Sequence, residues 1–417
     1  MNKRHGVLIA ILAFGCCCFF CDKEATKPDK EEPASLDSPS IMSFAEISQL
    51  PQGETLYLHV NRQGFDIEIR PVVFDGLYVL AGERLLLCHT VDGFPIGAGD
   101  SGSPVATTDG RIVGVLCYGY DFNNTQFEAR VIEDVLSVGH GTASLKSSNS
   151  KRTFPFHFAA GIRQELLQRL AQTEAGEYLP ELHAMEFYSA AAGLNKDFST
   201  EATLKCGSTI TIFEIYGDLL LYGATGTASY VTPDSIFAFG HSYGDRSTPV
   251  AAPVFLSEML SFINSGSSSF KNSVPTQQLI GSFVKQDDFG IFIDGKKPVQ
   301  TFPLLVTLKM PNGDSLFYLH TIANSQSPSL ERYLTGMAIG SLAFNKIKTD
   351  LYYEAVVANL TMNITTNQGS YELSGSADDV AYWIDYAIFS YIYYDSFIQA
   401  DDEHFTSYKV LVNIEQQ

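Results

Sequence analysis

Hydrophobic residues alternate with polar ones over long stretches of the chain, and this period of two most limits how it folds. The alternation is clear over residues 55–60 and again over residues 65–70. Successive side chains of a strand point to opposite faces of a sheet, so such segments form half-buried strands. The 29 Phe, 21 Tyr and 33 Gly fit the same class, because aromatic residues favour strands and glycine favours turns. The sequence predicts a mainly β protein.

Other segments extend this pattern. Further strands are expected over residues 111–118, 209–230 (interrupted at 217–218 and at 223–226), 352–365, 382–394 and 407–414. Apolar residues at helical spacing predict helices near residues 162–170 and 330–342, whereas residues 131–138 fit either a strand or a helix. The apolar stretch 380–395 contains Asp385 and five tyrosines, which favours a buried sheet over a membrane span.

The N-terminus has the pattern of a secretory signal. Basic residues at positions 3–4 precede an apolar run over residues 7–14, which is too short to cross a bilayer. The run ends in Ala-Phe-Gly-Cys, similar to the box in which bacterial lipoproteins attach lipid to a cysteine, here Cys16. An uncleaved signal anchor is the alternative. Residues 22–40 are charged and contain proline, which predicts a disordered tether over residues 16–42.

Cysteine and charge content exclude several classes of protein. Only Cys88, Cys117 and Cys206 lie beyond the signal region, so a disulfide framework and a zinc site of paired cysteines are excluded. We expect three buried thiols, with one disulfide as the alternative. The net charge of −20 argues against nucleic-acid binding, which needs a basic surface. It also opposes binding to anionic lipid, so membrane association is expected through the N-terminal lipid.

The strongest local signal for chemistry is the sequence Gly-Asp-Ser-Gly-Ser-Pro at residues 99–104. A serine between glycines in a tight turn exposes its hydroxyl and leaves backbone N–H groups free for a developing oxyanion. In the trypsin-like arrangement the donors are the N–H groups of Gly99 and Ser101. Residues 97–102 also fit the dinucleotide motif G-x-G-x-x-G, but a hairpin rather than a helix is predicted to follow, so a nucleotide site is excluded.

A serine nucleophile needs a general base, and His241 is the best candidate. It follows an apolar strand, stands in the sequence Gly-His-Ser-Tyr-Gly-Asp, and has the carboxylate of Asp245 four residues on. A base at a strand end reaches a nucleophile on another strand pair, and a nearby acid fixes its tautomer.

These motifs resemble the SpoIVB-type serine peptidase family, which shares the trypsin-like catalytic logic. The nucleophile turn is similar to the family's G-M-S-G-S-P. Further similar elements follow in the same order over residues 52–306: Asp-Gly-Arg-Ile-Val-Gly-Val at 109–115, Val-Ile-Glu-Asp-Val-Leu at 131–136, Tyr-Gly-Asp-Leu at 216–219, Gly-Thr at 226–227, Ala-Phe-Gly-His at 238–241, Ser-Phe-Lys at 269–271 and Gln-Asp at 286–287. Two departures are Asp100 in place of Met and Ser242 in place of Pro.

The resemblance implies a fold and a set of site residues. It implies a trypsin-like double β-barrel in permuted order, with the nucleophile half (43–150) before the histidine half (151–308). A C-terminal domain (309–417), either α+β or sandwich-like, follows them. Ser101 is the implied nucleophile and His241 the base. The third member is Asp245, with Asp92 and Asp287 as alternatives.

Three functions remain open at this point. The first is a serine endopeptidase anchored to the bacterial envelope by lipid, facing the periplasm or the exterior, which cleaves polypeptides through an acyl-enzyme. The second is an inactive relative that binds or scaffolds other proteins. An esterase is disfavoured, because the strand-to-helix nucleophile elbow is absent. Neither a cofactor nor a metal is expected, because the nine histidines are dispersed.

Overall fold

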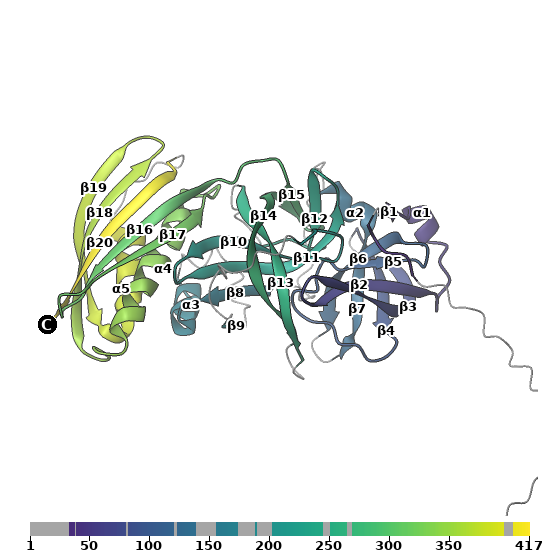
Figure 1. Ribbon diagram of the computed structural model, residues 1–417, viewed down its shortest axis with the longest axis horizontal. Coiled ribbons are helices and arrows are strands. Elements are labelled where there is room, and N and C mark those ends of the chain that lie inside the picture. Colours follow the sequence, from purple (N-terminus) through teal and green to yellow (C-terminus); the bar gives the residue numbers. More distant parts are fainter. Residues whose placement is uncertain are drawn as a thin grey trace, which may run out of the picture. The chain divides into compact units, whose positions relative to one another are not determined.

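The chain is seen in a computed structural model, and strands form most of it, as predicted (Figure 1). The structure describes residues 33–37, 39–80, 82–120, 123–138, 156–173, 188–189, 202–244, 251–264, 269–395 and 403–417. The predicted signal peptide, Cys16 and most of the predicted tether lie outside these residues. Residues 33–417 form one compact unit, to which the description below applies.

The first part of this unit is a closed, six-stranded antiparallel barrel. Its strands are β2 (Thr55–Gln63), β3 (Asp66–Leu80), β4 (Glu83–Thr90), β5 (Pro104–Ala106), β6 (Arg111–Tyr120) and β7 (Asn123–Val131). They pair in the order β6-β5-β2-β3-β4-β7, and β7 pairs back with β6. The inward side chains of β2 are Leu56, Leu58 and Val60, which are fully buried, so the predicted alternation is confirmed.

Short elements complete this barrel. Strand β1 (Ser40–Ile41) adds to β6 in parallel, and helix α1 (Phe44–Ile47) begins with a capping box between Ser43 and Glu46. Helix α2 (Ile132–Ser137) follows β7 directly. The ambiguous segment 131–138 is therefore a helix after its first residue.

A second group of six strands is joined by a circuit of antiparallel pairings. These strands are β10 (Thr209–Gly217), β11 (Leu221–Val231), β12 (Ser235–Ala238), β13 (Ala252–Ile263), β14 (Phe270–Asp287) and β15 (Gly290–Asp294). They pair in the order β10-β13-β14-β15-β12-β11, and β10 also pairs with β11. Strands β8 (Phe156–Ala160) and β9 (Tyr188–Ser189) extend the sheet beside β11. The helix predicted near residues 162–170 is confirmed as α3 (Gln164–Ala171).

The predicted break at residues 223–226 is wrong, because β11 runs through it. Its glycines serve close packing instead of a turn. A Cβ atom at Gly223 would lie 2.0 Å from the carbonyl oxygen of Ile212 on β10. A Cβ atom at Gly226 would lie 2.3 Å from the ring of Phe239. The break predicted at Gly217 is confirmed, since β10 ends there.

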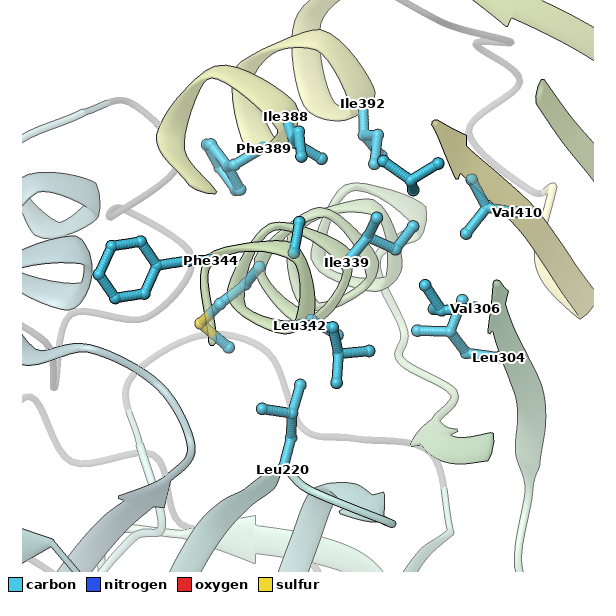
Figure 2. Close-up of a cluster of buried hydrophobic side chains, with 14 of the residues drawn as sticks. Leu220, Leu304, Val306, Ile339, Leu342, Phe344, Ile388, Phe389, Ile392 and Val410 are labelled. Atoms are coloured by element: carbon cyan, nitrogen blue, oxygen red, sulfur yellow. The ribbon is translucent and has the colours of Figure 1, made fainter. Parts of the chain in front are cut away.

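The C-terminal part is a five-stranded extension of the same sheet, covered by helices. The strands are β16 (Thr301–Lys309), β17 (Ser315–Ala323), β18 (Ala355–Thr366), β19 (Ser370–Val380) and β20 (Phe405–Gln416), in the order β19-β18-β20-β16-β17, and β17 pairs with β10. Helix α4 (Pro328–Ile347) confirms the helix predicted near residues 330–342. Figure 2 shows Ile339 and Leu342 of α4 packed between the side chains of the helical segment 384–395 and those of β16 and β20.

The strand predicted over residues 382–394 is wrong. This segment is helical: a 3₁₀ turn (Ala381–Trp383), helix α5 (Ile384–Ser390) and a π turn (Tyr391–Asp395). Ile384, Ile388 and Ile392 recur every four residues and pack on α4, which explains the helix. In the described part of the chain, every helix is too short or too polar to cross a membrane.

The three cysteines among the described residues are free and buried, as expected. Cys88 and Cys117 lie in the first barrel and Cys206 precedes β10. Burial raises the pKa of the Cys117 thiol to about 12 and that of Cys206 to about 11, so neither forms a thiolate near neutral pH.

A buried ion pair joins α3 to α5. Two nitrogens of Arg163 donate to the two carboxylate oxygens of Asp385, at 3.0 and 2.7 Å. The guanidinium group also stacks on aromatic rings: those of Phe344, Tyr382 and Trp383. Burial raises the pKa of Asp385, and the bond to Arg163 opposes that rise. This planar arrangement suits arginine and not lysine.

We therefore expect Arg163→Lys to lower the free energy of unfolding by about 1–2 kcal/mol, because lysine keeps the charge but loses the two-pronged bond and the stacking. Urea denaturation measures the difference. Arg70→Lys is the control, since Arg70 pairs with Glu68 at the surface and its replacement should change stability by less than about 0.5 kcal/mol. Equal effects of the two substitutions would contradict the role given to Arg163.

Candidate active site

Ser101 lies at the centre of a tight turn, as predicted, immediately before β5. Gly99 and Gly102 have φ values of 89° and 95°, a left-handed backbone that glycine adopts without strain. The turn is closed by bonds from the Asp100 N–H to the Gly97 carbonyl and from the Ser103 N–H to the Asp100 carbonyl, at 3.0 and 2.9 Å. The residue Ser101 is 7% exposed, and its hydroxyl is in no hydrogen bond with the described residues.

Neither of the two predicted oxyanion donors is hydrogen-bonded to a described residue. Hydrogen bonds of the described residues use the N–H groups of Ala98, Asp100, Gly102 and Ser103, but not those of Gly99 or Ser101. Buried backbone N–H groups are nearly always paired, so two free ones on one turn need an explanation. Alternate N–H groups of such a turn form an anion-binding site.

Asp100 is held by a buried cationic cluster. Two guanidinium nitrogens of Arg62 donate to its two carboxylate oxygens, one of them at 2.7 Å, and the Lys271 ammonium lies 3.5 Å away. Asp100 and Lys271 are fully buried, and Arg62 is 8% exposed and packs against the ring of Phe262. Burial lowers the pKa of Lys271 to about 8, and Asp100 opposes that fall. Asp100, which departs from the family pattern, is thus the anchor of the turn.

Thr227 on β11 connects the nucleophile turn to the histidine strand. Its N–H donates to the Ser101 carbonyl and its hydroxyl to the Gly99 carbonyl, both at 2.9 Å. Its own carbonyl accepts the N–H of Phe239, and its hydroxyl oxygen accepts from Lys271 at 2.8 Å. One threonine therefore holds the carbonyls of Gly99 and Ser101 and ties the nucleophile turn to β11.

His241 follows strand β12, as predicted, and the loop that carries it touches the nucleophile turn. Phe239 and Gly240 have φ values of 71° and 70°. For Phe239 this left-handed conformation costs about 1–3 kcal/mol, which is typical of functional sites. A Cβ atom at Gly102 would lie 2.6 Å from the Phe239 nitrogen, so the turn and the loop are in backbone contact.

The imidazole of His241 is set up as a neutral base. Nδ1 lies 2.7 Å from the Ser242 carbonyl, which only accepts, so Nδ1 carries the proton and Nε2 keeps its lone pair. Nε2 is buried and has no partner among the described residues. The pKa of His241 is lowered to about 4, chiefly by burial and to a smaller extent by the charge of Arg130. The ring is neutral at pH 7.

The third member of the predicted triad is not seen at His241. Asp245 lies outside the described residues. The alternatives bond elsewhere: a carboxylate oxygen of Asp92 accepts the Phe94 N–H, and one of Asp287 accepts the Phe289 N–H. In the described chain, a backbone carbonyl and not a carboxylate orients the ring. Nor does a hydrogen bond join Ser101 and His241 in this part of the chain.

A buried polar group lies beside the histidine loop. The Tyr243 hydroxyl donates to Glu214, whose pKa burial raises to about 7. The ring of His157 lies 5.1 Å from that of Tyr243, centre to centre, and burial lowers its pKa to about 3. Polar side chains of β10 (Glu214) and β8 (His157) therefore lie beside the loop that carries His241.

Sequence reasoning missed the roles of Arg62, Thr227, Lys271 and Arg130. One signal for Arg62 was present: it continues the even-numbered row of β2 that is otherwise apolar, so alternation places it inward. The resemblance included Thr227 and Lys271 as motif residues without a role. Nothing in the sequence pattern indicated Arg130.

The described residues contain no cluster of three His, Cys, Asp or Glu side chains able to hold a metal ion. In comparisons with known proteins, neither a family model, nor a curated protein, nor a solved structure matches the chain.

Proposed function

We propose that the protein is a serine endopeptidase that cleaves polypeptides through an acyl-enzyme, with Ser101 as nucleophile and His241 as general base. The observation that carries this proposal is the pair of N–H groups at Gly99 and Ser101, which bond to no described residue and lie on the turn that contacts the histidine loop. A neutral imidazole with an unpartnered Nε2 on that loop supports it.

The strand pairings also support the proposal. We take the circuit of β10–β15 as a second barrel beside the closed barrel of β2–β7, which gives a trypsin-like double barrel. The nucleophile turn precedes β5 of the first barrel and the histidine follows β12 of the second, which is the permuted order. A triad is defined by geometry and not by chain order.

The proposed reaction follows from these groups. The Ser101 hydroxyl attacks the carbonyl carbon of the scissile bond while His241 Nε2 takes its proton. The resulting oxyanion accepts hydrogen bonds from the N–H groups of Gly99 and Ser101. The imidazolium then protonates the leaving amine, and the acyl group stays on Ser101. Water attacks this ester with His241 again as base, which releases the acid and restores the hydroxyl.

We further propose that lipid on Cys16 anchors the enzyme to the bacterial envelope, with the polar residues that follow as the spacer. Bacterial lipoproteins face polypeptides of the envelope, which are the substrate class that this location favours.

A catalytically inactive binding or scaffold protein is the second candidate. It is favoured by one observation: in the described residues Ser101 and His241 share no hydrogen bond, and no carboxylate bonds His241. Against it, catalytic hydrogen bonds often tighten only when substrate is bound.

The test is labelling of the compact unit, residues 33–417, with a fluorophosphonate, which reacts only with an activated serine. We expect the wild type to label and both Ser101→Ala and His241→Ala to lose labelling by at least about a thousandfold in rate. Ser103→Ala is the matched control: Ser103 is in the same turn and fully buried, and its loss should leave labelling unchanged.

Circular dichroism establishes that each variant is folded. Labelling that survives Ser101→Ala, or a folded wild type that never labels, would reject the peptidase and favour the scaffold.

A further inference from the structure

Arg130 is a buried cation between the first barrel and the histidine loop. It lies on β7 and is fully buried. Its Nε donates to the Gly240 carbonyl at 2.9 Å, and one Nη donates to the Tyr118 hydroxyl at 2.9 Å. Glu83, at 3.4 Å, supplies the opposite charge. The other Nη is buried without a hydrogen-bond partner among the described residues. Breaking the contacts that are made would leave more of a buried charge unpaired, so they hold the loop against β7.

The bond to Gly240 acts at the residue immediately before His241. Gly240 also approaches β6 closely: a Cβ atom there would lie 3.1 Å from the Leu116 carbonyl oxygen. That same carbonyl accepts the N–H of Gly102, the residue immediately after Ser101. The histidine loop and the nucleophile turn therefore both contact the Leu116 carbonyl of the first barrel. The side chain of Arg130 holds the loop against this barrel through its bond to Gly240.

We propose that Arg130 is a positioning residue of the active site, which fixes the His241 loop against the nucleophile turn and places a positive charge near the imidazole. The expected effect of Arg130 on the labelling rate rests on the proposed function, whereas its expected effect on the pKa of His241 does not depend on catalysis.

The positive charge of Arg130 lowers the pKa of His241. Burial is the largest cause of the lowered pKa of His241, the Ser242 carbonyl opposes it, and the Arg130 charge adds to it. His157 on β8 interacts with the same ring, and burial holds that group neutral as well. Glu83 and Asp134 act on Arg130. Removing the Arg130 charge should therefore raise the pKa of His241 toward 6.5.

The experiment measures the fluorophosphonate labelling rate against pH for the wild type, Arg130→Met and Arg130→Lys. We expect the acid limb of the profile, near pH 4 in the wild type, to move up by on the order of one pH unit in Arg130→Met. The rate at pH 8 should fall by at least about tenfold, because the loop loses its fastening. Arg130→Lys keeps the charge, so its limb should stay in place while its rate falls.

A second readout needs no catalysis: NMR titration of the His241 ring, assigned by its loss in His241→Ala. Its midpoint should rise in Arg130→Met. Glu83→Gln keeps Arg130 and removes a negative charge, so it must not raise the midpoint of the His241 titration.

The proposal would be overturned if Arg130→Met left three quantities unchanged: the acid limb of the labelling profile, the midpoint of the His241 titration and the labelling rate at pH 8. If Arg130→Met does not fold, a wild-type rate in Arg130→Lys overturns it. A wild type that titrates as expected but never labels would reject the peptidase and leave this inference standing.

Discussion

Replacing Asp100 with Asn is expected to lower the free energy of unfolding by about 3–5 kcal/mol and to abolish fluorophosphonate labelling. The amide leaves Arg62 and Lys271 as buried cations without their counter-charge. It also weakens the anchor of the turn that carries the free N–H groups of Gly99 and Ser101. Urea denaturation measures the first effect and the labelling rate the second.

The control for Asp100→Asn is Glu68→Gln, which also breaks a carboxylate–arginine pair, but at the surface. Glu68 and Arg70 are each about a third exposed, and such pairs contribute less than about 1 kcal/mol. The variant Arg62→Met/Asp100→Leu/Lys271→Met separates the two effects. Apolar replacement of a whole buried cluster often restores stability, so this variant should fold and still fail to label. Normal labelling of Asp100→Asn would show that the cluster has no part in the site.

Replacing Gly102 with Ala is expected to lower the free energy of unfolding by about 2–6 kcal/mol and to reduce the labelling rate by at least about a hundredfold. The new Cβ atom would lie 2.2 Å from the Thr227 carbonyl oxygen and 2.6 Å from the Phe239 nitrogen. Both are backbone atoms, so the overlap pushes the nucleophile turn away from the histidine loop. Denaturation and labelling measure the two effects.

Gly53→Ala is a closely matched control for Gly102→Ala. Gly53 has a φ value of 89°, against 95° for Gly102, but nothing lies within 4 Å of an added Cβ atom. Its free energy of unfolding should fall by only about 1–2 kcal/mol, from the strain of a left-handed alanine, and it should label normally. If the two variants lose equal stability, backbone strain alone explains the loss in Gly102→Ala. The contact between the turn and the histidine loop would then contribute nothing to the free energy of unfolding.

Local sequence pattern predicted most strands and helices, because each depends on the period of its own side chains. The inward row of β2 and the helix α4 are examples. The pattern failed where packing overrode it. An apolar stretch with Asp385 and five tyrosines suggested a strand over residues 382–394, but a row of isoleucines packs on α4 and the segment is helical. Gly223 suggested a turn, yet it permits the close approach of two strands.

The candidate site divides in the same way. The sequence alone indicated the tight turn around Ser101 and the strand-end position of His241, because glycines favour turns and the end of an apolar run indicates the end of a strand. Tertiary structure alone decided what surrounds them. Arg62 and Asp100 are 38 residues apart, and Arg130 and Gly240 are 110 apart. Such contacts arise when distant strands pair, because buried charges come together only once the whole fold has formed. The local period of side chains cannot predict them.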